Sequence, residues 1–138
     1  MKSNASSGFQ SFDFATRAKD LINNKQVQEF LAQPGTKERL TNYLESGSVA
    51  GLIETDRPLV EIIVSLISIY ALQTAFEQCK SDEVVRQYMG LIERMQNGEN
   101  LQQEMIELVP KIPAEFKDAV RTASNHAQKV LIGLIKSA

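Results

Sequence analysis

The run from Leu59 to Cys79 constrains the fold most, because it contains no glycine or proline and its part from Leu59 to Leu72 is apolar on nearly every side of a helix. Its β-branched residues would also suit a buried strand, but strands rarely exceed about ten residues, so its length favours a helix. A helix that is apolar on all sides is typically buried at the centre of a domain. We therefore predict an all-α fold around a central buried helix that spans about residues 58–79.

Cap residues and apolar spacing predict further helices on both sides of the central one, which gives a bundle of five or six. The first begins after Ser11 and runs to Leu31, with a weak point at Asn23 and Asn24. The others are expected from Thr36 to Gly47, from Ser81 to Gly98, from Asn100 to Pro110, and over about residues 113–136, with a helical turn over residues 49–53.

The C-terminal helix carries the most regular pattern in the chain. Its apolar residues follow spacings of four and three, the heptad seam of a helix that packs along a near-parallel or antiparallel neighbour. The seam consists of Phe116, Val120, Ala123, Ala127, Val130 and Leu134. We predict that this helix is the main partner of the central helix.

Small residues on the two long helices indicate where they approach one another. The central helix has a stripe of small or polar residues, and the last helix has alanines four residues apart. The two stripes are Glu61, Ser65, Ser68, Ala71 or Leu72, and Ala75, and then Ala119, Ala123 and Ala127. Either the stripes face each other within one chain, or the stripe on the central helix receives a helix from another chain.

Length and composition favour one ordinary soluble domain. The chain has 138 residues and a formal net charge of −2. We expect a disordered tail over residues 1–11 and a single helical domain over residues 12–138, with no signal peptide at the N-terminus. Because Cys79 is the single cysteine, no internal disulfide can form, which fits a cytoplasmic location.

The sequence lacks the patterns of several enzyme classes. Cys79 stands near the end of a helix, where the dipole does not favour a thiolate. The glycines do not cluster into a phosphate-binding loop. His126 and Cys79 are too few for a zinc site, and Glu99, Glu104 and Glu107 are expected to form a solvated acidic face. We therefore expect no enzyme activity, no cofactor and no metal.

One short motif leaves an enzymatic alternative open. The spacing of Arg121 and His126 resembles the Arg-x4-His motif of HEPN-type ribonucleases, which are small all-α domains that often dimerise. The resemblance implies a metal-independent ribonuclease in which these two residues act on the RNA backbone. On one helix the two side chains point about 140° apart, so a second chain or a bend would have to bring them together.

Nucleic-acid and membrane binding are less favoured. Basic residues are dispersed and there is no tryptophan, so we expect no strong nucleic-acid binding. The run from Leu59 to Phe76 is at the length threshold of a membrane-spanning helix, which makes a membrane-inserting bundle a second alternative. Polar residues such as Glu61 and Gln73 in the run argue for a core helix instead.

These observations favour a non-enzymatic protein–protein interaction module: an adaptor, assembly subunit, chaperone or inhibitor. It would act through a helical surface or an oligomer interface, with another protein as partner and homo-oligomer formation left open. Ile132 lies off the heptad seam, which directs it toward the surface. The candidate partner-binding residues are Tyr43, Tyr88, Met89, Met95, Ile132 and Ile135.

Overall fold

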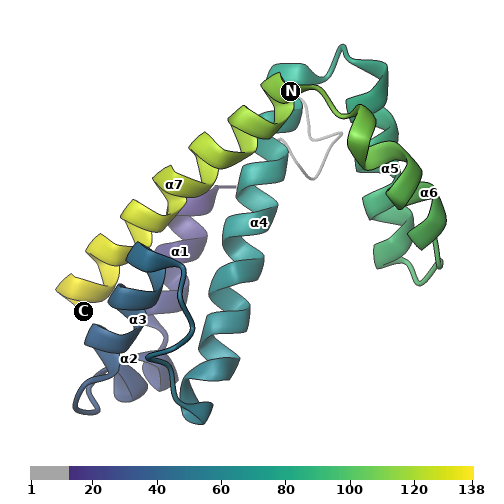
Figure 1. The fold of residues 1–138 in the computed structure, drawn as a ribbon. Coiled ribbons are helices and arrows are strands. Elements are labelled where there is room, and N and C mark those ends of the chain that lie inside the picture. The colour runs from purple at the N-terminus through teal and green to yellow at the C-terminus, as the bar shows by residue number, and fades with distance from the viewer. Residues whose placement is uncertain (1–12) are drawn as a thin grey trace. The chain divides into compact units, whose positions relative to one another are not determined.

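The structure, a computed structural model, describes residues 13–138 and is all-α within that range (Figure 1). The predicted tail over residues 1–11 and the cap at Ser11 lie outside the described residues. The helices are α1 (Phe14–Asn23), α2 (Lys25–Leu31), α3 (Thr36–Ser46), α4 (Arg57–Cys79), α5 (Glu83–Gln96), α6 (Gln102–Leu108) and α7 (Ala114–Ser137), with short 3-10 helices η1 (Glu54–Asp56) and η2 (Val109–Lys111).

The predicted first helix is two helices, and Asn24 separates them. Its backbone is extended, with φ −60° and ψ 136°, which interrupts the helical path. Its side-chain oxygen accepts hydrogen bonds from the N–H groups of Gln26 and Val27, so it caps α2. Asparagine favours this role over a place inside a helix, because its amide competes for backbone hydrogen bonds.

Other helix ends follow the predicted cap chemistry. Asp82 accepts a hydrogen bond from the N–H of Val85 at 3.1 Å and starts α5. Gly47 adopts φ 75° after α3, a conformation that glycine reaches without steric cost. Residues 49–53 contain a single turn, in which the N–H of Leu52 donates to the carbonyl oxygen of Val49 at 3.0 Å, and the first helix after them is η1 at Glu54–Asp56.

The chain forms two compact units. Unit 1 comprises, of the described residues, 13–70 and Ser124–Ala138, and unit 2 comprises Ala71–Ala123. Helices α4 and α7 therefore each contribute one half to unit 1 and one half to unit 2.

Unit 1 has its own hydrophobic core, to which five helices contribute. The aromatic rings of Phe14 and Tyr70 lie 4.8 Å apart between their centroids and connect α1 to α4. The buried residues of this core are Phe14, Ala18, Ile22, Leu31, Leu40, Leu44, Leu59, Ile63, Ile67, Ala127, Leu131 and Ile135.

Unit 2 has a second group of buried residues, from the C-terminal half of α4, from α5 and α6, and from the start of α7. The rings of Tyr88 and Phe116 meet edge to face, with centroids 5.8 Å apart. The buried apolar residues are Ala71, Ala75, Cys79, Val85, Met89, Leu101, Leu108, Ile112, Phe116, Ala119 and Ala123.

Helix α4 spans the predicted residues, but the prediction that it is buried on all sides is wrong. At each turn, one side of the helix is buried and the others are not. Its buried positions recur every four residues: Leu59, Ile63, Ile67, Ala71, Ala75 and Cys79. Other large apolar side chains of α4 are exposed, including Ile62 at 49%, Val64 at 40% and Ile69 at 38%. Helix α4 therefore has more apolar surface than the other described residues cover.

The buried face of α7 differs from the predicted heptad seam at Val120, which is half-buried beside the buried Ala119, and again in the C-terminal half. Leu131 and Ile135 are fully buried, whereas the predicted Val130 and Leu134 are only half-buried. From Ala119 onward the buried positions of α7 are four residues apart, as they are on α4. Four-residue ridges are typical of helices that cross at an angle, whereas a heptad seam requires a neighbour that runs alongside.

The alanines of the two predicted small-residue stripes are buried, whereas the polar residues are not. Ala71 and Ala75 of α4 and Ala119 and Ala123 of α7 are all buried within unit 2. The polar part of the predicted stripe, with Glu61, Ser65 and Ser68, is exposed in unit 1. Alanine can be buried without leaving a polar group unsatisfied, whereas a carboxylate or hydroxyl needs a hydrogen-bond partner.

Candidate functional site: a groove along α4

A hollow lies in unit 1 where the segment after α3 passes the first turns of α4. It has a volume of about 380 Å³. Val49 and Ile53 come from the irregular segment and are 66% and 51% exposed. Val60 forms part of its α4 side. The full lining is Val49, Leu52, Ile53, Glu54, Arg57, Val60 and Glu61.

A second hollow, of about 180 Å³, follows in unit 1 along the same helix. Val64 lies one helical turn after Val60, so the two hollows succeed one another along α4. The second is lined by Tyr43, Leu44, Gly47, Val64, Ile67, Ser68, Ser124 and Gln128. We call the two hollows together the α4 groove. It extends from Arg57 to Ser68, which is about 17 Å or three helical turns.

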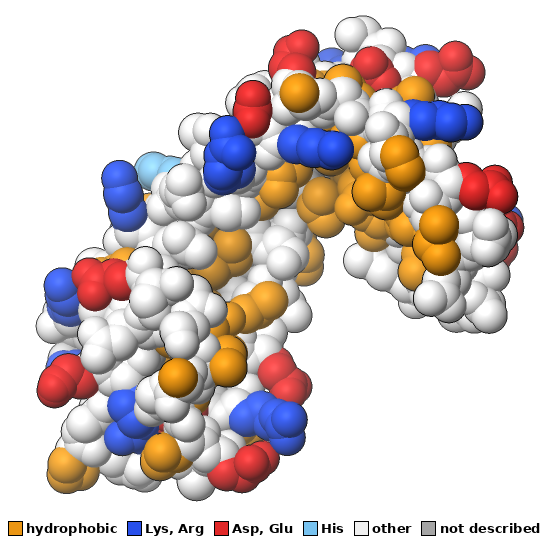
Figure 2. Space-filling view, viewed as in Figure 1, with side chains coloured by type: hydrophobic (Ala, Val, Ile, Leu, Met, Phe, Trp, Pro, Cys, Tyr) orange, Lys and Arg blue, Asp and Glu red, His pale blue; other side chains and the backbone are white. Residues whose placement is uncertain are grey.

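Hydrophobic side chains are visible on this face of unit 1. In Figure 2 they gather over the segment between α3 and α4, with acidic and basic side chains beside them. Val49, Ile53 and Val64 are the large exposed hydrophobic residues that line the groove. Exposed apolar residues that line neighbouring hollows are more informative than scattered ones.

The end of the groove near Glu54 carries three charges. Arg57 lies between two glutamates, with Nη1 at 3.1 Å from Oε1 of Glu54 and Nε at 3.7 Å from Oε2 of Glu61. All three side chains are more than two-thirds exposed. The two glutamates carry two negative charges and Arg57 carries one positive charge, so these three side chains have a net charge of −1.

A buried ion pair fixes the wall that contains η1. Asp56 is fully buried, and its carboxylate accepts hydrogen bonds from Arg39 and from the N–H of Ile53 at 2.9 Å. The hydrogen bonds from Arg39 are the main reason that the pKa of Asp56 lies below its ordinary value, although burial acts in the opposite direction. Asp56 directly precedes α4, and its carboxylate joins η1 to α3.

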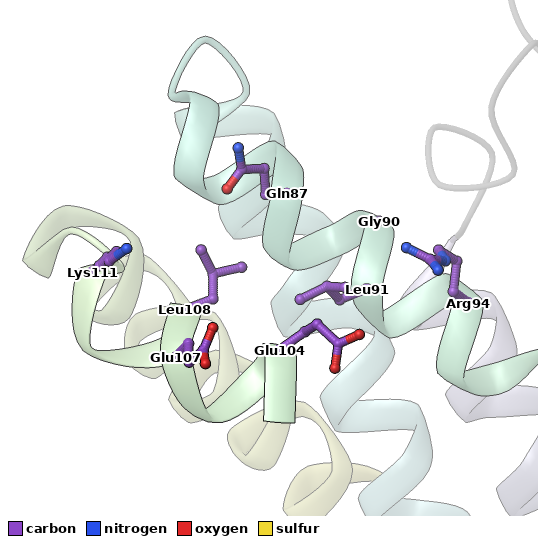
Figure 3. A pocket seen from close by; sticks show the side chains of 8 residues that line it. All are labelled: Gln87, Gly90, Leu91, Arg94, Glu104, Glu107, Leu108 and Lys111. Atoms are coloured by element: carbon purple, nitrogen blue, oxygen red, sulfur yellow. The ribbon is translucent and has the colours of Figure 1, made fainter. Parts of the chain in front are cut away.

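A separate cavity of about 450 Å³ lies between α5 and α6 in unit 2. Figure 3 shows Leu91 of α5 and Leu108 of α6 pointing toward one another across it, with Glu104 and Glu107 along one side. Gly90 also lines the cavity, and a Cβ atom at this glycine would meet nothing within 4 Å.

Arg94 lines the same cavity but is already paired. Its Nη2 lies 2.8 Å from Oε1 of Glu99, in the loop between α5 and α6. This contact raises the pKa of Arg94 and lowers the pKa of Glu99. The guanidinium therefore holds the loop, and it contributes little free positive charge to a ligand.

The six predicted partner-binding residues lie in different environments. Tyr43 lines the α4 groove, and Met95 is 40% exposed in unit 2. Tyr88 is half-buried against Phe116, and Ile132 is half-buried against the core of unit 1. Met89 is 7% exposed and Ile135 is fully buried, so these two belong to the cores and offer a partner no surface.

Arg121 and His126 are both exposed, and they contact different neighbours. Arg121 donates a hydrogen bond to Asp118 at 2.7 Å. The ring of His126 lies 6.3 Å from that of Tyr70 between centroids. Cys79 is buried, and burial is the main reason that the pKa of its thiol is raised, so it is a poor nucleophile.

Helix α4 together with η1, over Glu54–Cys79, is the one helical stretch in residues 13–138 that is long and apolar enough to cross a membrane. The mean hydropathy of its most apolar window of 18 residues is 1.9, and 33% of that window is buried. The central helix of a soluble protein meets the same test of length and composition, but it is mostly buried.

Across the described residues, no group of three or more His, Cys, Asp or Glu side chains is arranged to hold a metal ion. Over residues 13–138 the fold is thus that of a small all-α protein, with the α4 groove in unit 1 and a separate cavity in unit 2. Comparisons with protein-family models, with curated proteins and with solved structures found no match to this chain.

Sequence reasoning identified Tyr43 of the groove, and it placed Glu61 and Ser68 in the small-residue stripe of the central helix, but it missed Val49, Ile53 and Val64. Val49 and Ile53 lie on a segment without helical periodicity, and Val64 stands in a run that is apolar on every side. Periodicity therefore gave no signal for any of them. Gly47 and Gly51 stand two residues before and after Val49, and they mark the segment as a loop. A valine in a loop was therefore the available sign of an apolar residue at the surface.

Proposed function

We propose that this protein is a non-enzymatic interaction module that binds another protein through the α4 groove. The observation that carries the proposal is the incomplete burial of α4, whose most apolar window has a mean hydropathy of 1.9 while 33% of it is buried. Contiguous exposed apolar surface on a soluble protein is typical of sites that bind a partner.

The distribution of polar groups supports the same proposal. Protein interfaces commonly have an apolar centre and a polar rim. Val60 and Val64 lie along the middle of the α4 groove, whereas Glu54 and Glu61 border one end and Ser124 borders the other. The groove thus has the composition of an interface that forms and dissociates.

Two single substitutions on α4 test the proposal. Val64 and Ile69 are almost equally exposed, at 40% and 38%, but they point about 140° apart on the helix. Val64 lines the groove and Ile69 lines no cavity described here. The tagged full chain and the Val64→Arg and Ile69→Arg variants would each be used to capture partners from the native cell, with mass spectrometry as the readout.

A partner that docks in the groove should be lost with Val64→Arg and retained with Ile69→Arg. The introduced guanidinium would have to be desolvated in the interface, which weakens binding by about tenfold or more. Circular dichroism should give wild-type helix content for both variants. Capture of the same proteins by both variants, in equal amounts, would contradict the proposal.

Insertion of α4 into a membrane is a second candidate function. The length and hydropathy of Glu54–Cys79 favour it. In a bilayer, Arg is unfavourable at the centre of a spanning helix whichever side carries it. Flotation with phospholipid vesicles should therefore decrease for Val64→Arg and Ile69→Arg alike. The groove proposal expects no flotation with vesicles and a difference between the variants in protein capture.

A further inference from the structure

We infer that the α4 groove takes one amphipathic helix from a partner protein, with a basic residue over Glu54 and Glu61. This inference rests on the proposed function and adds the chemistry of the partner. Three features of the groove carry it: its length, the surplus negative charge at one end, and the uncharged hydrogen-bonding groups at the other.

The dimensions of the groove match a single short helix. Its length of about 17 Å corresponds to about three turns. Gly47 and Gly51 stand along the irregular wall, and a Cβ atom at either one would meet nothing within 4 Å. Ser68 is a small residue on the α4 side. Small residues along a groove let a helix backbone approach closely, with apolar anchors at spacings of three and four.

The acidic end of the groove favours a basic residue. Glu54 and Glu61 share Arg57, and their side chains are 85% and 71% exposed. One carboxylate charge is left without compensation, and it lies where Val60 and Ile53 provide apolar contact. The aliphatic part of a lysine or arginine would cover the apolar residues while its charged group meets the glutamates.

The other end of the groove offers neutral hydrogen-bonding side chains. Within residues 13–138, the side chains of Tyr43, Ser68, Ser124 and Gln128 make no hydrogen bond to another protein group. They retain acceptor oxygens as well as donors. Both ends of a helix have backbone groups without a partner inside that helix, N–H groups at the first turn and C=O groups at the last, and such side chains can pair with either.

The test uses two synthetic peptides of fourteen residues with the same apolar anchors, N-acetylated and C-amidated. One peptide carries two lysines in its last turn, and the other carries two glutamates there. Each is titrated into the ¹⁵N-labelled full chain, and amide chemical shifts give the site and the affinity. We expect the lysine peptide to shift the amides of the groove and to bind about fivefold more tightly.

The double variant Glu54→Lys/Glu61→Lys is the control for differences in helix content between the peptides. Both side chains are well exposed, so the substitutions should leave the fold unchanged. We expect this variant to prefer the glutamate peptide. A preference for the lysine peptide that persists in the double variant would overturn the inference, because it would belong to the peptide and not to the groove.

The remaining outcomes separate this inference from the proposed function. Equal affinity of both peptides, with shifts in the groove, would overturn the charge requirement and leave groove docking intact. Binding of neither peptide would overturn the helical occupant, and protein capture with Val64→Arg would then test the proposed function alone. Concentration-dependent shifts of the groove without peptide would identify a second copy of the chain as the occupant and overturn the inference.

Discussion

Arg39 of α3 and Asp56 of η1 are seventeen positions apart and are joined by two hydrogen bonds between one guanidinium and one carboxylate. Nε of Arg39 donates to Oδ2 of Asp56 at 2.8 Å, and Nη2 donates to Oδ1 at 3.0 Å. The same guanidinium donates to the hydroxyl of Thr36. Asp56 is fully buried, so this contact determines where the chain turns into α4.

We predict that Asp56→Asn lowers the free energy of unfolding by about 2–4 kcal/mol, because it leaves Arg39 without its counter-charge in a partly buried site. Urea unfolding followed by circular dichroism would measure the change. Glu54→Gln is the matched control, since the Glu54–Arg57 pair is exposed and such pairs contribute little. Equal effects of the two substitutions would contradict the structural role of Asp56.

The same carboxylate should make stability depend on pH. The pKa of Asp56 is lowered in the folded protein, chiefly by the hydrogen bonds from Arg39. Its contribution is therefore complete above the unfolded value of about 3.9 and is lost as pH falls toward the lower folded value. The free energy of unfolding, measured with urea at several pH values below about 5, should change less steeply with pH for Asp56→Asn than for wild type. Identical slopes would exclude Asp56 as a source of acid sensitivity.

Gly90 stands inside α5, where glycine costs helix stability. A Cβ atom there would meet nothing within 4 Å, so Gly90→Ala should stabilise the protein by about 0.5–1 kcal/mol. Gly47→Ala is the opposite case, because Gly47 has φ 75° and alanine is strained there. The midpoint temperature of thermal unfolding should therefore rise for Gly90→Ala and fall for Gly47→Ala. Destabilisation by Gly90→Ala would mean that α5 is not helical at this position.

Two methionines of α5 allow a direct test of which residues belong to the core. Met89 is 7% exposed and Met95 is 40% exposed. Met89→Asp should destabilise by about 3 kcal/mol or more, since a carboxylate would be buried without a partner. Met95→Asp should change the unfolding midpoint little. If Met89→Asp unfolds like wild type, the side chain of Met89 faces solvent.

Much of the fold could be predicted from local chemistry. The extent of α4, the cap at Asp82 and the stop at Gly47 follow from residues whose preferences act over a few positions. The break at Asn24 was harder to predict, because the apolar spacing continues across it while the side chain caps a new helix. The shift of the buried face from Val130 to Leu131 depends on the direction in which neighbouring helices cross.

Sequence reasoning reached the groove through Tyr43 and through Glu61 and Ser68 of the small-residue stripe. A run as apolar as the middle of α4 does not indicate which of its sides the rest of the chain covers. Val64 and Ile63 are adjacent and equally apolar, but one is 40% exposed and the other is 1% exposed. That difference comes from tertiary packing, and so does the partition of the chain into two units.

The four-residue spacing of the buried positions on α4 also limits what can bind there. Four residues advance by about 40° more than one full turn, so the covered strip winds around the helix by about 200° from Leu59 to Cys79. The covered strip thus passes over little more than half of the circumference of α4 from one end to the other, and the free strip winds with it. A straight partner helix can follow that free strip for only a few turns, so a longer recognition segment would have to bend or end.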